Sequence, residues 1–393
     1  MNPGESNAVI TGIGQSQVGR RLMRSGLDLT AEAALAAIGH AGLSVEDIDG
    51  LSSWPGKLAD NPGMSPVSVS EVKEALELRL NWFNAGMETA GQLGGVFNAI
   101  MAVATGQARH VLCYRTLIES SIQGMARRGA SHGSLDTRLG DHLQYLIPYG
   151  PSASNWTGVF AQRYCHDHGL TREQLGQVAV TLRANARKNP VAVYQEPLTL
   201  EDYLAARMIS TPLCLYDCDV PIDGATAIIV SARDACGGLA NPPLTVEAFS
   251  GAHRERDSWY QRPDLTTMAA HDAGAALWQR TRLTPADVDI AQVYDGFSIY
   301  VPMWLNALQL VAAKDTGAFL AEGGHSLAGR LPINTGGGQL SAGRLHGFGH
   351  LHEACVQLWG LGGERQVNTH LEVAAVGVGG GPLGGCMLLS RHN

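Results

Sequence analysis

Apolar and polar positions follow the same order in two distant parts of the chain. Residues 30–51 have apolar positions at helical spacing, then a turn and a short acidic segment that leads into a strand, and residues 268–295 repeat this order. An apolar segment typical of a strand precedes each copy, at residues 8–14 and at residues 244–252. The pattern therefore predicts the same strand, helix and strand in both halves of the chain.

A second set of elements also occurs twice. Residues 90–114 hold a glycine-rich segment followed by an apolar helix and a strand. Residues 347–366 hold a similar glycine-rich segment and an apolar helix that ends at glycines. Each half ends in a glycine-led apolar strand, at residues 224–232 and at residues 383–390. Repeats of this length indicate duplicated domains, and the alternation of strands and helices indicates layered α/β packing.

The first half contains extra material that the second half lacks, at residues 115–222. It holds a long helical segment in which Thr171 is a suitable N-cap and Gln174 lies in the first turn. We therefore divide the chain into an N-terminal half at residues 1–243, which includes the inserted loop domain, and a C-terminal half at residues 244–393. An insertion of this length typically shapes a ligand site or an interface.

Composition excludes several classes of protein. Hydrophobic residues make up 45% of the 393 residues and charged residues 16%. No apolar run approaches the ~18 residues of a membrane-spanning helix, and the N-terminus lacks the pattern of a signal peptide, so we expect a cytoplasmic protein. The net charge of -8 without a basic block argues against nucleic-acid binding. The seven cysteines form no C-x-x-C pair, so we expect reduced thiols and no structural zinc.

Several segments together resemble the thiolase superfamily, over nearly the whole chain. The segments are LSVEDIDGL, LCLYDCDVPIDGATAIIVSA, LTPADVDIAQVYDGFS, LPINTGGGQLSAGRLHG and VGVGGGPLGG. They are most similar to the sterol carrier protein X-type thiolases and to the lipid-transfer-protein aldolases of steroid side-chain degradation. The resemblance implies a duplicated five-layer αβαβα fold with an inserted loop domain.

The chain departs from the thiolase pattern at the catalytic positions. The nucleophilic cysteine of the family corresponds to Thr89, the histidine that activates it corresponds to Arg344, and the second cysteine corresponds to Gly377. Thioester exchange needs a thiolate, and a threonine hydroxyl is too basic to replace it without a dedicated base. The chain is therefore not expected to be a working thiolase.

The resemblance implies a retro-aldol cleavage, which needs an acid and a base but no nucleophile. The steroid side-chain aldolases use a tyrosine in their Y-D-G-F-S-type motif, where Tyr294 stands, although a core tyrosine that closes a strand is an alternative interpretation. We expect Arg344 to lie beside Tyr294 and to lower its pKa from the ordinary ~10. His346, which can titrate near neutrality, is the candidate for the second acid or base. Asp295 completes the predicted catalytic set as the residue that orients the loop.

Helix N-termini and glycine-rich loops are expected to bind the thioester, because their backbone N–H groups can stabilise an enolate. The residues expected to line it are Thr89, Gly347, Gly379 and Gly380. His350 and His352 are interpreted as polar residues at a helix entry, and the segment at residues 216–219 as structural.

The leading functional hypothesis is a retro-aldolase that cleaves a β-hydroxyacyl-CoA, in particular a steroid side-chain thioester, to a ketone and a short acyl-CoA such as propionyl-CoA. The alternatives are a divergent thiolase or acyltransferase subunit and a non-catalytic acyl-CoA or sterol binding protein. The resemblance further implies a homodimer and a small partner with an OB-fold and a zinc ribbon. No cofactor and no metal are expected, because the CoA thioester is the substrate.

Overall fold

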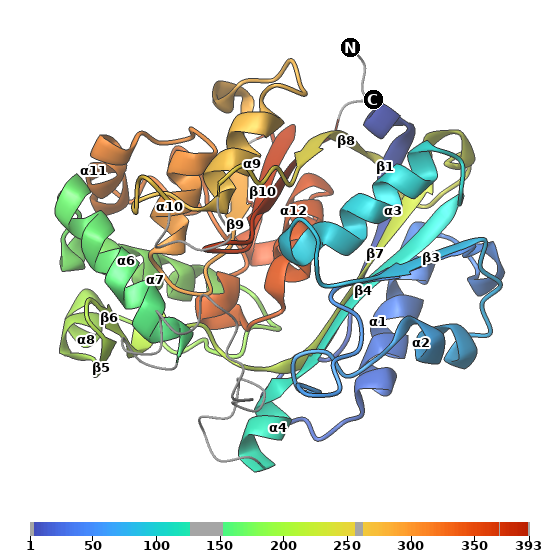
Figure 1. Ribbon diagram of the computed structural model, residues 1–393, viewed down its shortest axis with the longest axis horizontal. Coiled ribbons are helices and arrows are strands. Elements are labelled where there is room, and N and C mark those ends of the chain that lie inside the picture. The colour runs from blue at the N-terminus through green and yellow to red at the C-terminus, as the bar shows by residue number, and fades with distance from the viewer. Residues whose placement is uncertain (1–3, 126–151, 256–261, 369, 392–393) are drawn as a thin grey trace.

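The computed structural model describes residues 4–125, 152–255, 262–368 and 370–391 (Figure 1). The strands are β1 (Ala8–Gln15), β2 (Gly50–Ser53), β3 (Trp82–Ala85), β4 (His110–Ile118), β5 (Met208–Ser210), β6 (Leu213–Cys214), β7 (Asp223–Ala232), β8 (Leu244–Ser250), β9 (Ile290–Val293), β10 (Val373–Val378) and β11 (Gly385–Ser390). The α-helices are α1 (Gly26–Ala41), α2 (Val69–Ala75), α3 (Gly94–Ala104), α4 (Glu119–Met125), α6 (Ala153–His168), α7 (Arg172–Ala186), α8 (Leu200–Ala205), α9 (Ala269–Leu277), α10 (Tyr300–Ala307), α11 (Thr316–Ala321) and α12 (His346–Leu358).

Strand pairing repeats between the two halves. The large sheet has the order β3-β2-β4-β7-β1-β8-β11-β10-β9. In the first half β3, β2 and β4 are parallel and β7 is antiparallel to both β4 and β1, whereas in the second half β9 and β10 are parallel and β11 is antiparallel to both β10 and β8. Ile333 forms a parallel bridge to Ala291 of β9, in the place that β3 takes beside β2. The predicted duplicated α/β fold is confirmed.

A short antiparallel pairing of β1 with β8, at Val9–Thr245 and Ile10–Leu244, joins the halves into one hydrogen-bonded sheet. The pattern of the sequence predicted two separate units and did not indicate that strands of the two halves pair with each other.

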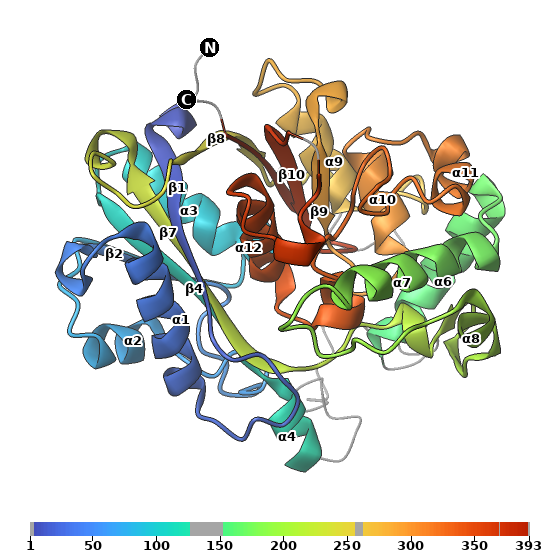
Figure 2. The same cartoon turned by 180° about the vertical axis from the view of Figure 1, so that it is seen from behind.

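The helices form three layers around the sheets. The outer face of the first half is covered by α1 and α2, and the outer face of the second half by α9 and α10 (Figures 1 and 2). The central layer consists of α3 and α12. Strands of both halves contact α12, and Phe97 of α3 stacks on Phe249 of β8 with a ring distance of 4.8 Å. Apolar side chains such as Phe97 of α3 and Leu351 of α12 share one buried cluster there with Val376 of β10. A helix that is apolar on most sides is stable only when it is covered on most sides, as both are here.

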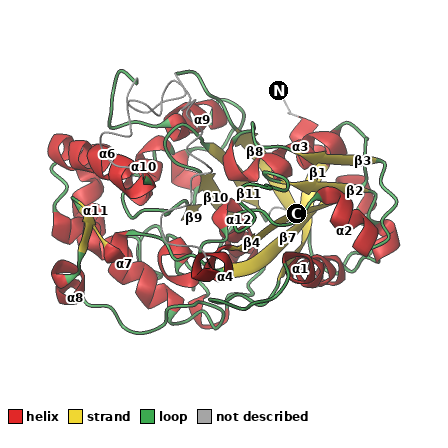
Figure 3. Ribbon diagram, turned by 60° about the horizontal axis from the view of Figure 1, so that its bottom comes forward, coloured by secondary structure: helices red, strands yellow, loops and turns green. Residues whose placement is uncertain are grey.

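The insertion leaves the first half and packs on the second. Its helices α6 and α7 share a buried cluster with α10 and α11, and they lie at the end of the molecule opposite α1 and α2 (Figure 3). The predicted cap of α7 is present, since the Thr171 side chain accepts a hydrogen bond from the Gln174 N–H and Gln174 Oε1 accepts one from the Thr171 N–H. The domain boundaries themselves stay a prediction.

The repeated turn before the second strand of each half has the same local structure. Ser44 and Asp47 form a capping box that starts a 3₁₀ turn before β2, and Thr284 and Asp287 form the same box before β9. Among the described residues, no helix combines the length and the apolar character that crossing a membrane requires.

Candidate active site

The two central helices begin side by side. A 3₁₀ turn at Gly91–Leu93 leads into α3, and α12 starts at His346. A Cβ placed on Gly347 would lie 2.8 Å from Val378 Cγ1 and 3.2 Å from Gln92 Cβ, so the start of α12 touches both the turn before α3 and the end of β10. The positive ends of two helix dipoles therefore face the same small region, an arrangement that favours a negatively charged oxygen.

The residues expected to bind the thioester surround this region. Thr89 is half-buried in the segment that precedes the 3₁₀ turn, and its hydroxyl donates to the Gly91 carbonyl oxygen at 3.2 Å. Gly379 accepts a hydrogen bond from Trp304 Nε1 at 2.9 Å, and Gly380 lies against the ring of Tyr300. The structure brings these residues and Gly347 to one end of the central layer, although their role in binding stays a prediction.

Tyr294 follows β9 and reaches the same region. Its backbone N–H donates to the Gly377 carbonyl oxygen at 2.7 Å, and its ring lies 5.7 Å from the Tyr300 ring and 6.4 Å from the His350 ring. The side chain is only partly buried, and its hydroxyl is within hydrogen-bonding reach of the Gln92 amide. Tyr294 therefore sits where the ends of β9 and β10 meet the turn before α3.

The expected lowering of the Tyr294 pKa is wrong. Burial raises the pKa of the Tyr294 phenol well above its ordinary value, and the negative charge of Asp219 raises it further. The positive charge of Arg344 acts in the predicted direction but does not outweigh these two causes. Tyr294 is therefore a neutral phenol near pH 7. It can transfer a proton, but it is not a phenolate in the free enzyme.

Arg344 binds two carboxylates. Its guanidinium lies 2.6 Å from Glu119 Oε2 and 3.1 Å from Asp219 Oδ1. Glu119 begins α4, and Asp219 belongs to the segment that precedes β7. Most of the charge of Arg344 is therefore balanced by acids that the sequence did not connect with it.

His346 does not titrate near neutrality, contrary to the sequence-based expectation. Burial lowers its pKa well below the ordinary value, and the neighbouring charges of Arg115 and Arg344 lower it further. Its Nδ1 accepts a hydrogen bond from Arg115 Nη2 at 2.9 Å, and its backbone N–H donates to Gln339 Oε1 at 3.1 Å. His346 is therefore a neutral imidazole whose Nδ1 is already engaged.

Arg115 is the partner that sequence reasoning missed. It is fully buried in β4, and its guanidinium lies 5.3 Å from the Trp54 ring centroid. Burial lowers its pKa to about 9, so it still carries its charge at pH 7. The signal in the sequence is an arginine inside a mostly apolar strand.

Asp295 anchors a backbone turn, and its place in the catalytic set stays a prediction. Its fully buried carboxylate accepts the backbone N–H groups of Gln339 and Leu340 at 2.9 and 3.2 Å. His350 Nε2 lies 3.3 Å from the same carboxylate but outside hydrogen-bond geometry. Because Gln339 in turn accepts the His346 N–H, Asp295 fixes the start of α12 through this turn.

The chain is similar in sequence and in fold to known proteins. Residues 251–387 match the model of the thiolase C-terminal domain-like family. The chain is 36% identical over 359 residues to a steroid side-chain-cleaving aldolase of Thermomonospora curvata, covering 88% of this chain and 89% of that protein. It is 34% identical to the 17-hydroxy-3-oxo-4-pregnene-20-carboxyl-CoA lyase of Mycobacterium tuberculosis, over 90% and 92% of the two chains.

A solved structure described as the Ltp2-ChsH2(DUF35) aldolase superposes with a TM-score of 0.87 at 33% identity, over 99% of this chain and 98% of that one. The chain belongs to the steroid side-chain aldolase family of the thiolase superfamily.

This aldolase-family chain has no room for the second thiolase cysteine. A Cβ placed on Gly377 would lie 2.5 Å from Trp304 Cε3, so the indole occupies the space of a side chain there. Burial raises the pKa of Cys218 to about 12 and raises the pKa of Cys113 and Cys386 above their ordinary values. These thiols are therefore protonated at pH 7 and poor nucleophiles.

A narrow cavity of about 60 Å³ runs along α12 from His346 to Glu353. Gln292 Oε1 and Gln339 Nε2 belong to residues that line it, and neither atom has a hydrogen-bond partner among the described residues. A cavity of this size has room for ordered water, whose hydrogen bonds would satisfy both atoms. Polar solvent can therefore reach the side of the aldolase site that faces α12.

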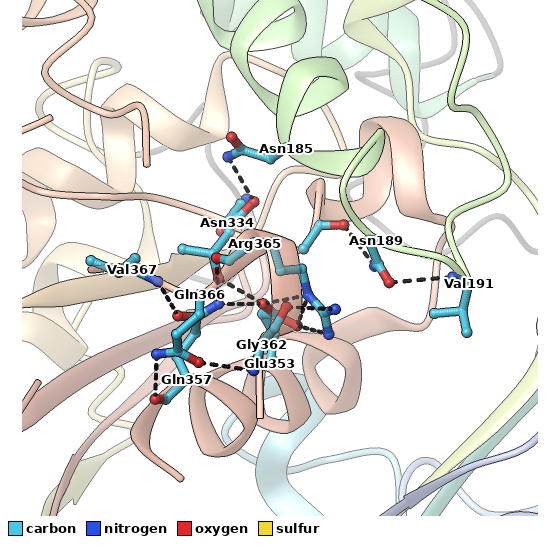
Figure 4. A network of polar contacts seen from close by, with 12 residues as sticks. Asn185, Asn189, Val191, Asn334, Glu353, Gln357, Gly362, Arg365, Gln366 and Val367 are labelled. Carbon is cyan, nitrogen blue, oxygen red and sulfur yellow. Dashed lines mark hydrogen bonds and ion pairs between the residues drawn. The ribbon is translucent and has the colours of Figure 1, made fainter. Parts of the chain in front are cut away.

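A polar network holds the far end of α12 in place (Figure 4). Arg365 Nε lies 3.0 Å from Glu353 Oε1, and Gln357 Nε2 donates to the same oxygen at 3.1 Å. Gln357 Oε1 also accepts the Val367 N–H at 3.0 Å. The helix that carries His346 is thus fixed at both ends, which keeps its N-terminus beside the start of α3.

Gly296→Ala is expected to lower turnover of this aldolase-family chain by about 10²-fold. A Cβ on Gly296 would lie 2.5 Å from Tyr294 Oη, so the phenol must move, and displacements of about 1 Å can cost that much. Steady-state kinetics on a variant with unchanged circular dichroism tests this. Gly39→Ala is the matched control, since no atom lies within 4 Å of its Cβ position. Unchanged turnover in Gly296→Ala would show that Tyr294 takes no part in catalysis.

Proposed function

We propose that the chain is a retro-aldolase that cleaves a steroid side-chain β-hydroxyacyl-CoA to a steroid ketone and propionyl-CoA. The observation that carries the proposal is a tyrosine at the meeting point of two helix N-termini in a site with no reactive thiol. Retro-aldol cleavage needs proton transfer and enolate stabilisation, whereas thiolysis needs a thiolate. The 17-hydroxy steroid acyl-CoA in the name of the Mycobacterium tuberculosis relative is the substrate class that we adopt.

The proposed mechanism assigns the thioester to the helix N-termini. Backbone N–H groups at the starts of α12 and of the turn before α3 hydrogen-bond the thioester oxygen, and they bind more strongly as negative charge develops on it. The Tyr294 hydroxyl accepts the proton of the substrate β-hydroxyl and gives its own proton to a neighbouring acceptor while the bond between the α- and β-carbons breaks. The bonding electrons remain on the α-carbon as an enolate, which is then protonated there.

We further propose a homodimer and a small partner. Strand β3 is the edge strand of the sheet, and its Phe83 side chain is 68% exposed, which supports pairing with a second copy. The solved aldolase with the TM-score of 0.87 has a DUF35 component in its name, which supports an OB-fold and zinc-ribbon partner for this chain. We assign the acyl-CoA as substrate rather than as cofactor, and we place the protein in the cytoplasm, where its seven free cysteines stay reduced.

Incubation with 17-hydroxy-3-oxo-4-pregnene-20-carboxyl-CoA, with and without a purified DUF35 protein, tests the function. We expect mass spectrometry to detect a steroid ketone and propionyl-CoA. Absence of the ketone under both conditions would overturn the aldolase proposal. Tight binding of the intact thioester in that case would identify a binding protein instead.

Thr89→Ala is expected to keep turnover within about tenfold of the natural protein, less than the ~10² that a lost acid or base costs. The Thr89 hydroxyl donates to the Gly91 carbonyl oxygen, which is not a base that could activate it as a nucleophile. Treatment with a thiol-alkylating reagent should likewise leave turnover largely intact. Loss of activity in proportion to one labelled cysteine would reinstate a covalent mechanism.

A further inference from the structure

One half-buried cation next to the site forms ion pairs with two carboxylates. Arg344 Nη2 lies 2.6 Å from Glu119 Oε2, and Arg344 Nη1 lies 3.1 Å from Asp219 Oδ1. The exposed fractions of the three side chains are 22%, 13% and 10%. Arg344 cannot balance both desolvated carboxylates, and the second guanidinium nearby, that of Arg115, interacts with Glu119. Close like charges therefore raise the affinity of Asp219 for a proton.

Asp219 is the acid that holds this proton more readily. Burial raises its pKa to about 7, the charges of Glu119 and Asp295 act in the same direction, and Arg344 opposes them. The Asp219 charge also acts on the neighbouring Cys218, Tyr300 and Tyr294, and on Tyr294 it acts more strongly than that of any other ionised group. Asp219 therefore changes its protonation state in the range where enzymes work, next to the phenol that the reaction uses.

The backbone holds the Asp219 segment against the loop that carries Tyr294. The Asp219 N–H donates to the Gly296 carbonyl oxygen at 3.2 Å, and a Cβ on the same glycine would touch Tyr294 Oη at 2.5 Å. Cys218 and Phe297 form an antiparallel bridge at this point, which ties the segment before β7 to the loop after β9. Two segments that are distant in sequence are thus held together beside the Tyr294 side chain.

We propose that Asp219 is the proton store of this active site, taking the substrate proton from Tyr294 and returning it through Tyr294 to the product. The proposal rests on the retro-aldolase function proposed above. Asp219 does not touch the substrate in this scheme, so it is a positioning and relay residue. It replaces the second acid or base that the sequence placed at His346.

The steps balance in protons and electrons. The substrate β-hydroxyl gives its proton to Tyr294 Oη while the Tyr294 proton moves to the Asp219 carboxylate. The electron pair of the hydroxyl forms the ketone carbonyl, and the broken carbon–carbon bond leaves its pair on the enolate of the acyl-CoA. Asp219 then returns its proton to Tyr294 as Tyr294 protonates the α-carbon, so both residues end in their starting forms.

The pH dependence of kcat/KM tests the proton store, because it reports groups of the free enzyme. Asp219 must be ionised to accept the proton, so kcat/KM should rise with pH through about 7. Asp219→Asn should lower turnover at least about 10²-fold and remove this rise. Glu119→Gln removes a negative charge that raises the Asp219 pKa, so the rise should move to lower pH.

Infrared spectroscopy gives a reading that does not depend on activity. The natural protein should show a protonated-carboxyl band that disappears as the pH rises through about 7. The band should be absent in Asp219→Asn and should titrate at lower pH in Glu119→Gln. Asp167→Asn, at an aspartate paired with Arg163 on the surface of α6, is the matched control and should change neither the band nor the kinetics.

The outcomes separate this inference from the proposed function. If the natural protein forms no ketone, the retro-aldolase function fails. If it forms the ketone but folded Asp219→Asn keeps its rate and its rise with pH, the proton store is wrong. Should Asp219→Asn fail to fold, a band in the natural protein that shifts in Glu119→Gln supports the proton store, and the absence of any band near pH 7 overturns it.

Discussion

Tyr294→Phe is expected to lower turnover by at least about 10²-fold, the lower end of what general acid–base catalysis contributes. The substitution removes only the hydroxyl, so the ring keeps its packing on Tyr300 and His350 and the fold should survive. The effect should fall on kcat more than on KM, because the hydroxyl acts on the proton that moves in the transition state. Steady-state kinetics with the steroid thioester measures both constants.

The matched control is Tyr164→Phe. Tyr164 is a buried tyrosine whose pKa is likewise raised by burial, but its hydroxyl donates to Asn306 of α10. We expect this variant to be less stable and to keep its turnover. Near-normal turnover in a folded Tyr294→Phe variant would show that Tyr294 is a packing residue and that the base lies elsewhere.

Asp295→Ala is expected to lower the free energy of unfolding by roughly 2–6 kcal/mol, because two buried N–H groups lose their acceptor at about 1–3 kcal/mol each. The groups are those of Gln339 and Leu340 in the turn before α12. Turnover should fall as well, since Gln339 accepts the N–H of His346 at the start of the helix. Urea unfolding followed by circular dichroism measures the stability.

Asp295→Asn removes the negative charge of the side chain but keeps one oxygen that can accept a hydrogen bond. The amide keeps one oxygen for the turn, so its loss of stability should be smaller than that of Asp295→Ala. Equal stability of the natural protein and Asp295→Ala would contradict the role of this carboxylate as the anchor of the turn. Normal stability with abolished turnover would instead indicate that Asp295 takes part in the chemistry.

Elements with a strong period were predictable from the sequence. The amphipathic helix, the acidic turn and the strand recur in both halves, and the structure places the same capping box before β2 and β9. These features depend on contacts within a few residues, so the local pattern determines them. The duplicated fold followed from the repeats together with the family resemblance.

The electrostatics of the site were not predictable, because its partners are distant along the chain. Arg344 lies 225 residues from Glu119 and 125 residues from Asp219, and His346 lies 231 residues from Arg115. Burial decides the pKa of His346 and of Tyr294, and burial at these positions results from the packing of both halves. The same reason applies to the insertion, whose packing against α10 and α11 leaves no local pattern.

The measurement that tests the central claim most directly is the stoichiometry of products with and without free CoA, in heavy water. A retro-aldolase should form steroid ketone and propionyl-CoA in equal amounts, at a rate independent of free CoA. The propionyl-CoA should carry one deuterium on its α-carbon, because the returned proton exchanges with solvent. A rate that depends on free CoA, or propionyl-CoA formed without an equal amount of the steroid ketone, would contradict the retro-aldol mechanism.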